Sequence, residues 1–300
     1  METMRDIERR IDSVENTKKI TRAMKMVASA KLKSAQDLAE DARPFFNKTK
    51  TILNDIVKYT KDVREHPLLT ARDGNKHLIM AIGADRGLCG PFNNRIISRV
   101  QKEYEADNST LFLLGGRIRN YFKRRDYDIV SEYVDLDDYP GYEFARKLTQ
   151  EIISLYQEEI VDKVSVVYTH FNSALDQDLM LEQLIPVSPD INEEEAEEPE
   201  PEPESEEEKE PEKKIDYIYE PSPEQILDVL LPKYVNNMIY SMLLESKASE
   251  FGARMTAMDS ATENAEEMIE ELTLSYNRAR QAEITKEITE IVGGAGALEQ

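Results

Sequence analysis

The fold is decided by the first stretch of the chain, TMRDIERRIDSVENTKKITRAMKMVASAKLKSAQDLAEDARPFFNKTKTILNDIVKY (residues 3–59). It contains no glycine and one proline, Pro44, and it opens with Thr3 as a candidate N-cap and Asp6 three residues later. Apolar residues return at steps of four and three, which places each group on one helical face. We therefore predict one long helix, kinked at Pro44. The groups are Ile7, Ile11 and Val14; Ile20, Met24 and Val27; and Leu38, Ala42 and Phe45.

The other end of the chain has the same character. From Pro223 to Val292 there is one glycine, Gly252, and the sequence SPEQ (222–225) is a capping box with proline at the first helical position. We expect Pro232 to bend this helix and Gly293-Gly294 to end it. Four alanines at steps of four form a stripe that we expect to admit a closely packed partner helix: Ala253, Ala257, Ala261 and Ala265.

Two such helices require an unusual architecture. A helix of about 55 residues is about 80 Å long, more than a small globular domain can cover. The simplest solution is an antiparallel coiled coil in which the helices of residues 1–62 and 222–300 bury each other. A rod of this kind transmits position or force.

The middle of the chain, residues 76–220, has a different pattern. Short apolar runs alternate with helical segments, which indicates βαβ units and a mostly parallel sheet covered on both faces. The predicted fold class is therefore α/β plus a long antiparallel coiled coil, with a Rossmann-like domain between the two shaft helices. We expect strands at 78–82, 110–114, 128–133, 163–168 and 215–219, an antiparallel edge strand at 179–186, and helices at 94–104, 117–125 and 143–160.

Charge is unevenly distributed along the chain. The net charge is −22, and half of it comes from residues 190–214, a proline-containing acidic segment that we predict to be a disordered loop. Residues 16–34 carry six basic residues and no acid. This segment has no aromatic residue for base stacking, so we expect an acidic protein surface beside it and no nucleic acid; a solvated face is the alternative.

No catalytic chemistry is indicated. The glycine-rich turn from Gly83 to Gly90 lacks the Gly-Lys-Ser/Thr of a phosphate-binding loop and the spacing of a dinucleotide fingerprint, so we interpret it as structural. The single cysteine, Cys89, and the three scattered histidines do not suggest a nucleophile or a metal site. We expect no cofactor, no metal and no catalytic residue. No run of 18 apolar residues is present, and no leader peptide is expected, because the chain enters a helix at once.

Four stretches carry a resemblance to a known family. They are NTKKITRAMKMVASAKL (16–32), AIGADRGLCGPFN (81–93), ESKASEFGARMTAMDSATENAEEMI (245–269) and YNRARQAEITKEITEIVGGAGAL (276–298). In content and order they resemble the gamma subunit of bacterial F-type ATP synthase, over almost the whole chain except the acidic insertion. Photosynthetic members carry a redox insertion near this place, but the segment here has no cysteine, and we favour an inert loop over an electrostatic regulator.

The resemblance implies a function. The two terminal helices would form the central shaft that turns inside a ring of three alpha and three beta subunits. The α/β domain would lie near epsilon and the membrane c-ring, on the cytoplasmic face of the cell membrane without insertion into it, and the delta subunit would be a further partner in the complex. The subunit would be non-catalytic, coupling ion flow to ATP synthesis or hydrolysis.

Site residues follow from the same resemblance. The implied contacts with the beta subunit are Arg22, Met24, Lys25, Arg254, Arg280, Gln281, Thr285 and Glu287. The implied apolar bearing tip consists of Ile288, Ile291, Val292 and Ala295. Two alternatives remain: a coiled-coil scaffold or adaptor with a nucleotide-free Rossmann-like domain, and a nucleotide-dependent enzyme with helical arms.

Overall fold

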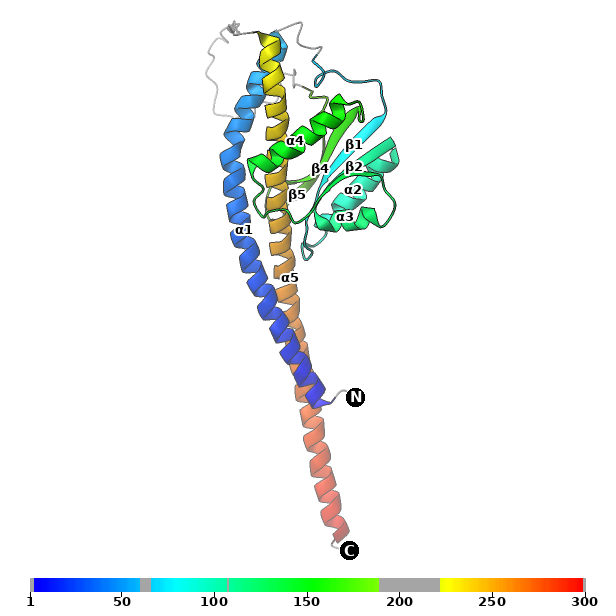
Figure 1. Cartoon of the computed structure of the whole chain (residues 1–300). Helices are drawn as coiled ribbons and strands as arrows, with labels where there is room; N and C mark the ends of the chain where they lie inside the picture. Colours follow the sequence, from blue (N-terminus) through cyan, green and yellow to red (C-terminus); the bar gives the residue numbers. More distant parts are fainter. Residues whose placement is uncertain (1–2, 60–65, 107, 189–221, 299–300) are drawn as a thin grey trace, which may run out of the picture.

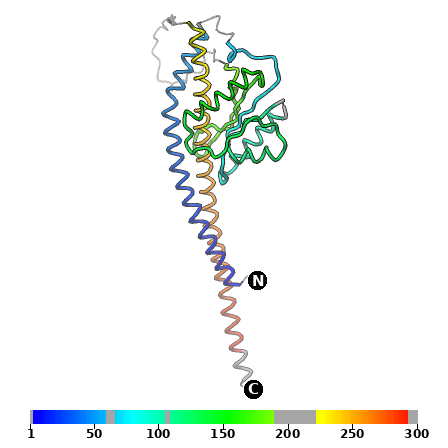
Figure 2. The backbone as a smooth tube through the Cα atoms, in the orientation of Figure 1, coloured from blue at the N-terminus to red at the C-terminus, as the bar shows by residue number. Residues whose placement is uncertain are grey.

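A computed structural model describes residues 3–59, 66–106, 108–188 and 222–298. Two helices dominate it, α1 (Met4–Tyr59) and α5 (Pro223–Leu298). They run antiparallel and side by side, and α5 continues beyond the beginning of α1 as a single helix (Figure 1). The N- and C-terminal ends of the chain therefore lie at different positions along the long axis of the shaft (Figure 2). The predicted shaft is confirmed.

Both helices begin where their capping residues predict. Thr3 Oγ1 donates to Asp6 Oδ2 at 2.6 Å, and Asp6 N donates back to Thr3 Oγ1 at 3.3 Å. At the start of α5, Gln225 N donates to Ser222 Oγ at 3.4 Å. Each contact satisfies a backbone or side-chain group that the first turn of a helix leaves without an intrahelical partner.

The end of α5 differs from expectation. Both helices continue through their internal prolines, Pro44 and Pro232, and the bends expected there stay predictions. The prediction that Gly293-Gly294 ends α5 is wrong, because the helix extends to Leu298. Glycine permits the left-handed conformation of a helix cap but does not impose it, and each glycine inside a helix costs only about 1 kcal/mol.

The buried face of α1 repeats every seven residues with great regularity. Ile7, Thr21, Ala28, Leu32 and Ala35 on this face are buried, and the seam positions Ile11, Val14, Lys18 and Lys25 are half-buried. A repeat of 3.5 residues per turn is the signature of a left-handed coiled coil. The full set is Ile7, Ile11, Val14, Lys18, Thr21, Lys25, Ala28, Leu32, Ala35, Ala39, Ala42, Phe46, Thr49, Leu53 and Ile56.

This seam corrects the apolar groups chosen from the sequence. The first group, Ile7 to Val14, lies on the seam, but Ile20 and Val27 are 60% and 56% exposed. In the third group only Ala42 lies on it, since Leu38 and Phe45 are exposed. The observed seam includes Lys18, Thr21 and Lys25. A search for apolar residues alone cannot find these three positions.

The alanine stripe of α5 also differs from expectation. Only Ala265 is buried on the seam with α1; Ala253 packs against the α/β domain instead. A step of four residues drifts around a helix that has 3.6 residues per turn, so the stripe passes from one neighbour to another. The α5 seam follows the heptad Phe251, Met255, Met258, Thr262, Ala265, Ile269, Leu272, Tyr276 and Ala279.

The α/β domain is a five-stranded sheet of order β3-β2-β1-β4-β5. The first four strands are parallel, and β5 pairs antiparallel with β4 at the edge, as predicted. The strands are β1 (Lys76–Ile82), β2 (Asn108–Leu114), β3 (Ile129–Tyr133), β4 (Lys163–Phe171) and β5 (Gln177–Ile185); the helices are α2 (Phe92–Ala106), α3 (Gly116–Lys123) and α4 (Tyr142–Gln157).

Two cores hold the domain together and attach it to the rod. On one face of the sheet, α4 and the upper halves of α1 and α5 bury residues such as Leu53, Tyr156 and Leu231. On the other face, α2 and α3 cover residues such as Ile79 and Leu113. The first core makes the shaft part of the domain, so the domain's orientation is fixed to the shaft (Figure 1).

The predicted boundaries at 62, 76, 220 and 222 stay predictions, because residues 60–65 and 189–221 lie outside the described residues. The same holds for the acidic loop 190–214 and the strand at 215–219.

Candidate functional surfaces

The basic segment of α1 finds much of its acidic surface within this chain. Across the seam, Lys18 lies 2.9 Å from Glu266 and Lys25 lies 2.5 Å from Asp259. Lys31 Nζ lies 2.5 Å from Asp138 Oδ2 in the loop after β3. The expectation that this segment faces carboxylates therefore holds in part inside one molecule. Two more bases pair along α1 itself, Lys19 with Glu15 and Lys33 with Asp37.

Arg22 and Met24, two of the residues implied to contact a partner, lie beside the seam of α1 and not among its repeating positions. Arg22 is exposed and forms no ion pair with a described residue, while Met24 is half-buried. The neighbouring Ile20, Met26 and Val27 are all more than half exposed. An arginine beside exposed aliphatic side chains is a composition typical of protein interfaces.

Arg254 is held within the chain. Its guanidinium donates to Glu250 at 2.8 Å and to the Gly87 carbonyl at 3.4 Å. Glu250 also accepts from Lys247 at 3.1 Å, and the three side chains are only 6–11% exposed. This charge network ties the glycine-rich turn to the shaft, so Arg254 has a structural role whatever else it contacts.

The carboxylate of Asp85 connects the glycine-rich turn to the segments that follow β2 and β3. Asp85 Oδ1 accepts from Gly116 N at 2.7 Å and from Asp135 N at 3.0 Å, while Oδ2 accepts from Leu136 N at 2.7 Å. Gly115 has φ +108°, and a Cβ there would stand 2.5 Å from the Gly83 carbonyl oxygen. These contacts support the structural interpretation of the turn.

Cys89, in the same turn, is buried, and burial raises the pKa of its thiol. Activated cysteines have a lowered pKa, so this thiol is not prepared for nucleophilic attack.

The histidines occupy three separate structural positions. His77 Nε2 lies 2.9 Å from Ser165 Oγ, His170 Nδ1 lies 2.6 Å from Glu245, and His66 Nε2 lies 3.3 Å from Asp228. Burial lowers the pKa of His66. Among the described residues no cluster of potential metal ligands occurs. No helix in the described ranges combines the length and apolar character needed to cross a bilayer.

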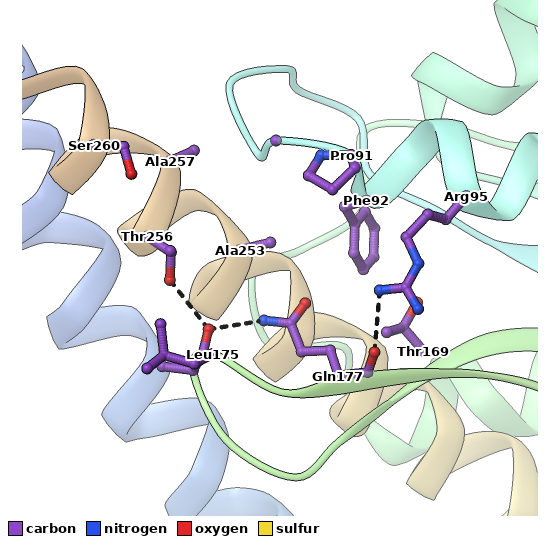
Figure 3. Close-up of a pocket in the computed structure, with 12 residues that line it drawn as sticks. Pro91, Phe92, Arg95, Thr169, Leu175, Gln177, Ala253, Thr256, Ala257 and Ser260 are labelled. Atoms are coloured by element: carbon purple, nitrogen blue, oxygen red, sulfur yellow. Dashed lines mark hydrogen bonds between the residues drawn. The ribbon is translucent and has the colours of Figure 1, made fainter. Parts of the chain in front are cut away.

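A groove separates the shaft from the lower edge of the α/β domain. Its floor is α5, with Ala253, Thr256 and Ala257, and its walls are Phe92 and the turn that holds Leu175 (Figure 3). The turn is fastened to α5, because Thr256 Oγ1 donates to the Ala174 carbonyl at 3.1 Å; Gln177 Nε2, at the start of β5, donates to the same carbonyl at 3.2 Å. Leu175 itself is 87% exposed. The cavity of about 330 Å³ opens at the rim of the domain, where α1 and α5 emerge below it.

The lower part of α5 packs against no other segment among the residues that the structure describes. Every residue from Arg280 to Val292 is exposed, including the implied contacts Arg280, Gln281, Thr285 and Glu287. Thr285 Oγ1 donates to the Gln281 carbonyl at 2.8 Å, so these two share one face. The tip residues Ile288, Ile291 and Val292 are 56–71% exposed. The side chain of Ala295 lies outside the described residues.

A lone helix of this length is marginal in water, and its apolar stripe has no cover. The exposed stripe of Ile284, Ile288 and Ile291 is of the kind that marks interaction surfaces in other proteins.

Several residues that matter in the shaft were missed from the sequence, namely Asp259, Glu266 and Glu250. A signal for the first two exists. Lys18 and Lys25 are seven residues apart on α1, and Asp259 and Glu266 are seven apart on α5, which is the heptad spacing of an interhelical pair. Glu250 had no such signal, because its two partners are an i−3 and an i+4 neighbour that any helix surface offers.

Known proteins are similar to this chain over nearly its whole length, including both shaft helices. A protein-family model described as ATP synthase matches residues 3–298. The ATP synthase gamma chain of Halothermothrix orenii is 55% identical over 99% of this chain and 100% of its own length. That of Heliobacterium modesticaldum is 48% identical over 99% of this chain and all of its own.

Solved structures share the fold. A chain from the rotor of the Euglena gracilis mitochondrial ATP synthase superposes with a TM-score of 0.65 at 17% identity, covering 94% of this chain and 98% of that one. A chain from the central stalk and c-ring structure of the Tetrahymena thermophila mitochondrial ATP synthase gives 0.58 at 22% identity, covering 81% and 99%. With the match extending over almost every residue of the shaft and the α/β domain, the chain belongs to the ATP synthase gamma chain family.

Proposed function

We infer that this chain is the central-stalk rotor subunit of an F-type ATP synthase, in which it couples rotation to ATP synthesis or hydrolysis. Its partners are three alpha and three beta subunits around the shaft, and epsilon, delta and the c-ring around the rest of the complex. The scaffold or adaptor alternative is not favoured, since the gamma-chain relatives match over the full length.

The observation that supports this function most strongly is the unpartnered end of α5. From Arg280 to Val292 the helix is exposed on all sides and carries an isoleucine stripe on one of them. A surrounding ring of subunits would cover the stripe. Ile288, Ile291, Val292 and Ala295 would then turn in an apolar bearing, while Arg280, Gln281, Thr285 and Glu287 would contact beta subunits nearer the domain.

Rotation acts through differential contacts. The shaft has unlike sides: the α/β domain is attached to one flank (Figure 1), and on α1 the exposed Arg22 and Met26 lie on one side of the helix while the exposed Ile20 and Val27 lie on another. Each orientation then presents a different side to each catalytic interface. If the shaft in one orientation binds one conformation of a beta subunit more tightly than another, it favours that conformation by the difference in binding free energy. The nucleotide affinity of that beta subunit changes by the same coupling free energy.

The subunit itself does no bond chemistry on this proposal. Cys89 has a raised pKa, and the histidines are held apart by separate structural partners. ATP would form at the alpha–beta interfaces. The complex would lie at the cytoplasmic face of the membrane, with this chain peripheral to it.

The test is reconstitution with alpha and beta subunits. Native mass spectrometry should give one copy of this chain per three alpha–beta pairs, and a bead on its α/β domain should turn in one direction during ATP hydrolysis, pausing in three orientations. Ile288→Glu, in the tip, should weaken assembly. Val130→Glu, an equal charge change at an exposed apolar residue of β3, is the matched control. A chain that hydrolyses ATP alone, or that never assembles with both partners, would refute the proposal.

A further inference from the structure

A cavity on the outer face of the α/β domain has a basic lining that the rotor function does not use. It lies between the glycine-rich turn, the start of α2 and helix α3, and its volume is about 560 Å³. Volumes of this size are common for sites of small ligands. Three arginines line it, Arg117, Arg124 and Arg125, and no carboxylate does.

The three guanidinium groups are free to bind an external anion. The structure gives none of them an ion pair with a described residue. The other two cations of α3 behave differently, because Arg119 and Lys123 both pair with Glu132, at 2.8 and 3.0 Å. In a chain of net charge −22, three arginines without a carboxylate in the same cavity make this place locally positive.

Arg125 is held in position, and Arg117 lies against the glycine-rich turn. Arg125 stacks on the ring of Tyr121 with its guanidinium carbon 3.8 Å from the ring centroid, and it donates to the Tyr121 carbonyl at 3.1 Å. Arg117 leans over the glycine-rich turn: a Cβ on Gly87 would stand 2.7 Å from its Nη2. Glycine at position 87 is what allows the guanidinium to lie against the backbone.

The position in the fold agrees with a ligand site. The cavity lies where β1 and β2 end, at the carboxyl edge of the parallel strands, which is where open α/β sheets bind ligands. The side-chain amides of Asn94 and Asn120 add polar groups to the wall. Planar guanidinium groups are the preferred partners of phosphate oxygens, since each can donate two parallel hydrogen bonds.

We propose that this cavity, the α3 arginine cavity, binds a small anion of the phosphate class, such as inorganic pyrophosphate or the phosphate chain of a nucleotide. The site is separate from the shaft surfaces and from ATP synthesis. Occupancy would neutralise the arginines next to the turn that Arg254 ties to the shaft through the Gly87 carbonyl.

The test is calorimetric titration of the full-length chain with pyrophosphate, ATP and adenosine at low salt and at about 0.15 M ionic strength. Saturable binding of pyrophosphate is expected, weaker at the higher salt. Competition of ATP with pyrophosphate, and no binding of adenosine, would assign recognition to the phosphates. Binding of ATP that pyrophosphate does not compete would instead place recognition on the base and overturn the proposal.

Matched variants place the site. Arg124→Gln and Arg117→Gln should each weaken pyrophosphate binding about tenfold, the effect of one charge-assisted hydrogen bond. Arg119→Gln removes the same charge from the same helix outside the cavity and should leave the affinity within about twofold. Gly87→Ala displaces the Arg117 guanidinium without a change in charge and should weaken binding as Arg117→Gln does. Circular dichroism verifies the fold of each variant.

Three results would overturn the proposal. One is the absence of saturable pyrophosphate binding by the folded wild-type chain. Another is an equal loss in Arg119→Gln and Arg124→Gln, which would mean a diffuse field. The third is tight binding of a polyglutamate peptide without any of pyrophosphate, which would identify the cavity as a docking surface for an acidic protein.

Discussion

Thr21 and Thr262 meet across the seam of the shaft, with their hydroxyl oxygens 2.8 Å apart and both side chains buried. Each hydroxyl also lies near a carbonyl of its own helix, Lys18 O at 3.1 Å and Met258 O at 2.7 Å. One hydroxyl therefore donates across the seam while the other donates within its helix. A buried polar pair of this kind favours one register of a coiled coil, because a shift by one turn would separate the two hydroxyls and leave each with one partner fewer.

Thr262→Val should destabilise the chain by about 1 kcal/mol, since it leaves the Thr21 hydroxyl with one partner fewer in a buried place. The double variant Thr21→Val with Thr262→Val should recover most of the loss, because both polar groups are then removed together. Chemical denaturation of the two single variants, the double variant and the wild type measures the coupling. Additive losses in the double variant would mean that the two hydroxyls do not depend on each other.

Lys25→Glu should weaken the shaft by up to about 1 kcal/mol, the range of a partly exposed ion pair, by placing two carboxylates together at Asp259. The exchanged pair Lys25→Glu with Asp259→Lys should restore stability in thermal unfolding. The same two variants separate internal pairing from partner contact. If ATPase activity of the assembled complex stays altered in the exchanged pair, Lys25 also acts on a neighbouring subunit. If the exchanged pair recovers both the thermal stability and the ATPase activity, Lys25 acts only within the seam.

Glu250→Gln should cost about 3 kcal/mol, because it leaves the nearly buried cations of Lys247 and Arg254 facing a neutral amide. Glu263→Gln, an exposed residue on the same helix, is the matched control and should change the unfolding free energy by less than about 0.5 kcal/mol. Equal effects in the two variants would show that the charge network does not stabilise the junction between turn and shaft.

Glu132 should titrate with a pKa of about 2, because it accepts hydrogen bonds from Arg119 and Lys123. Its ordinary pKa is 4.5, so the carboxylate stabilises the folded state above that pH. The contribution should disappear as the pH falls from 4.5 toward 2. Carbon-13 NMR of the side-chain carboxyl measures the pKa directly, and Arg119→Gln should raise it. A wild-type value near 4.5 would contradict the pairing.

The sequence by itself determined the elements and their order. Local signals are sufficient for this: the absence of glycine in residues 3–59, the caps at Thr3 and Ser222, and the alternation of short apolar runs with helical segments. These patterns depend only on residues close together in the sequence. The positions of β1 to β5, and β5 as an antiparallel edge strand, could therefore be predicted. The implied contact residues came from the resemblance and not from any local pattern.

Only the tertiary structure decided which face of each helix is buried. Ile20, Val27 and Phe45 are more apolar than Lys18, Thr21 and Lys25, yet the latter three lie on the seam. The reason is that two supercoiled helices keep in contact only at positions repeating every 3.5 residues, and a charged or polar side chain is accepted there if the other helix offers its partner. Those partners, Glu266, Thr262 and Asp259, are more than 230 residues away in the chain, where no local pattern reaches.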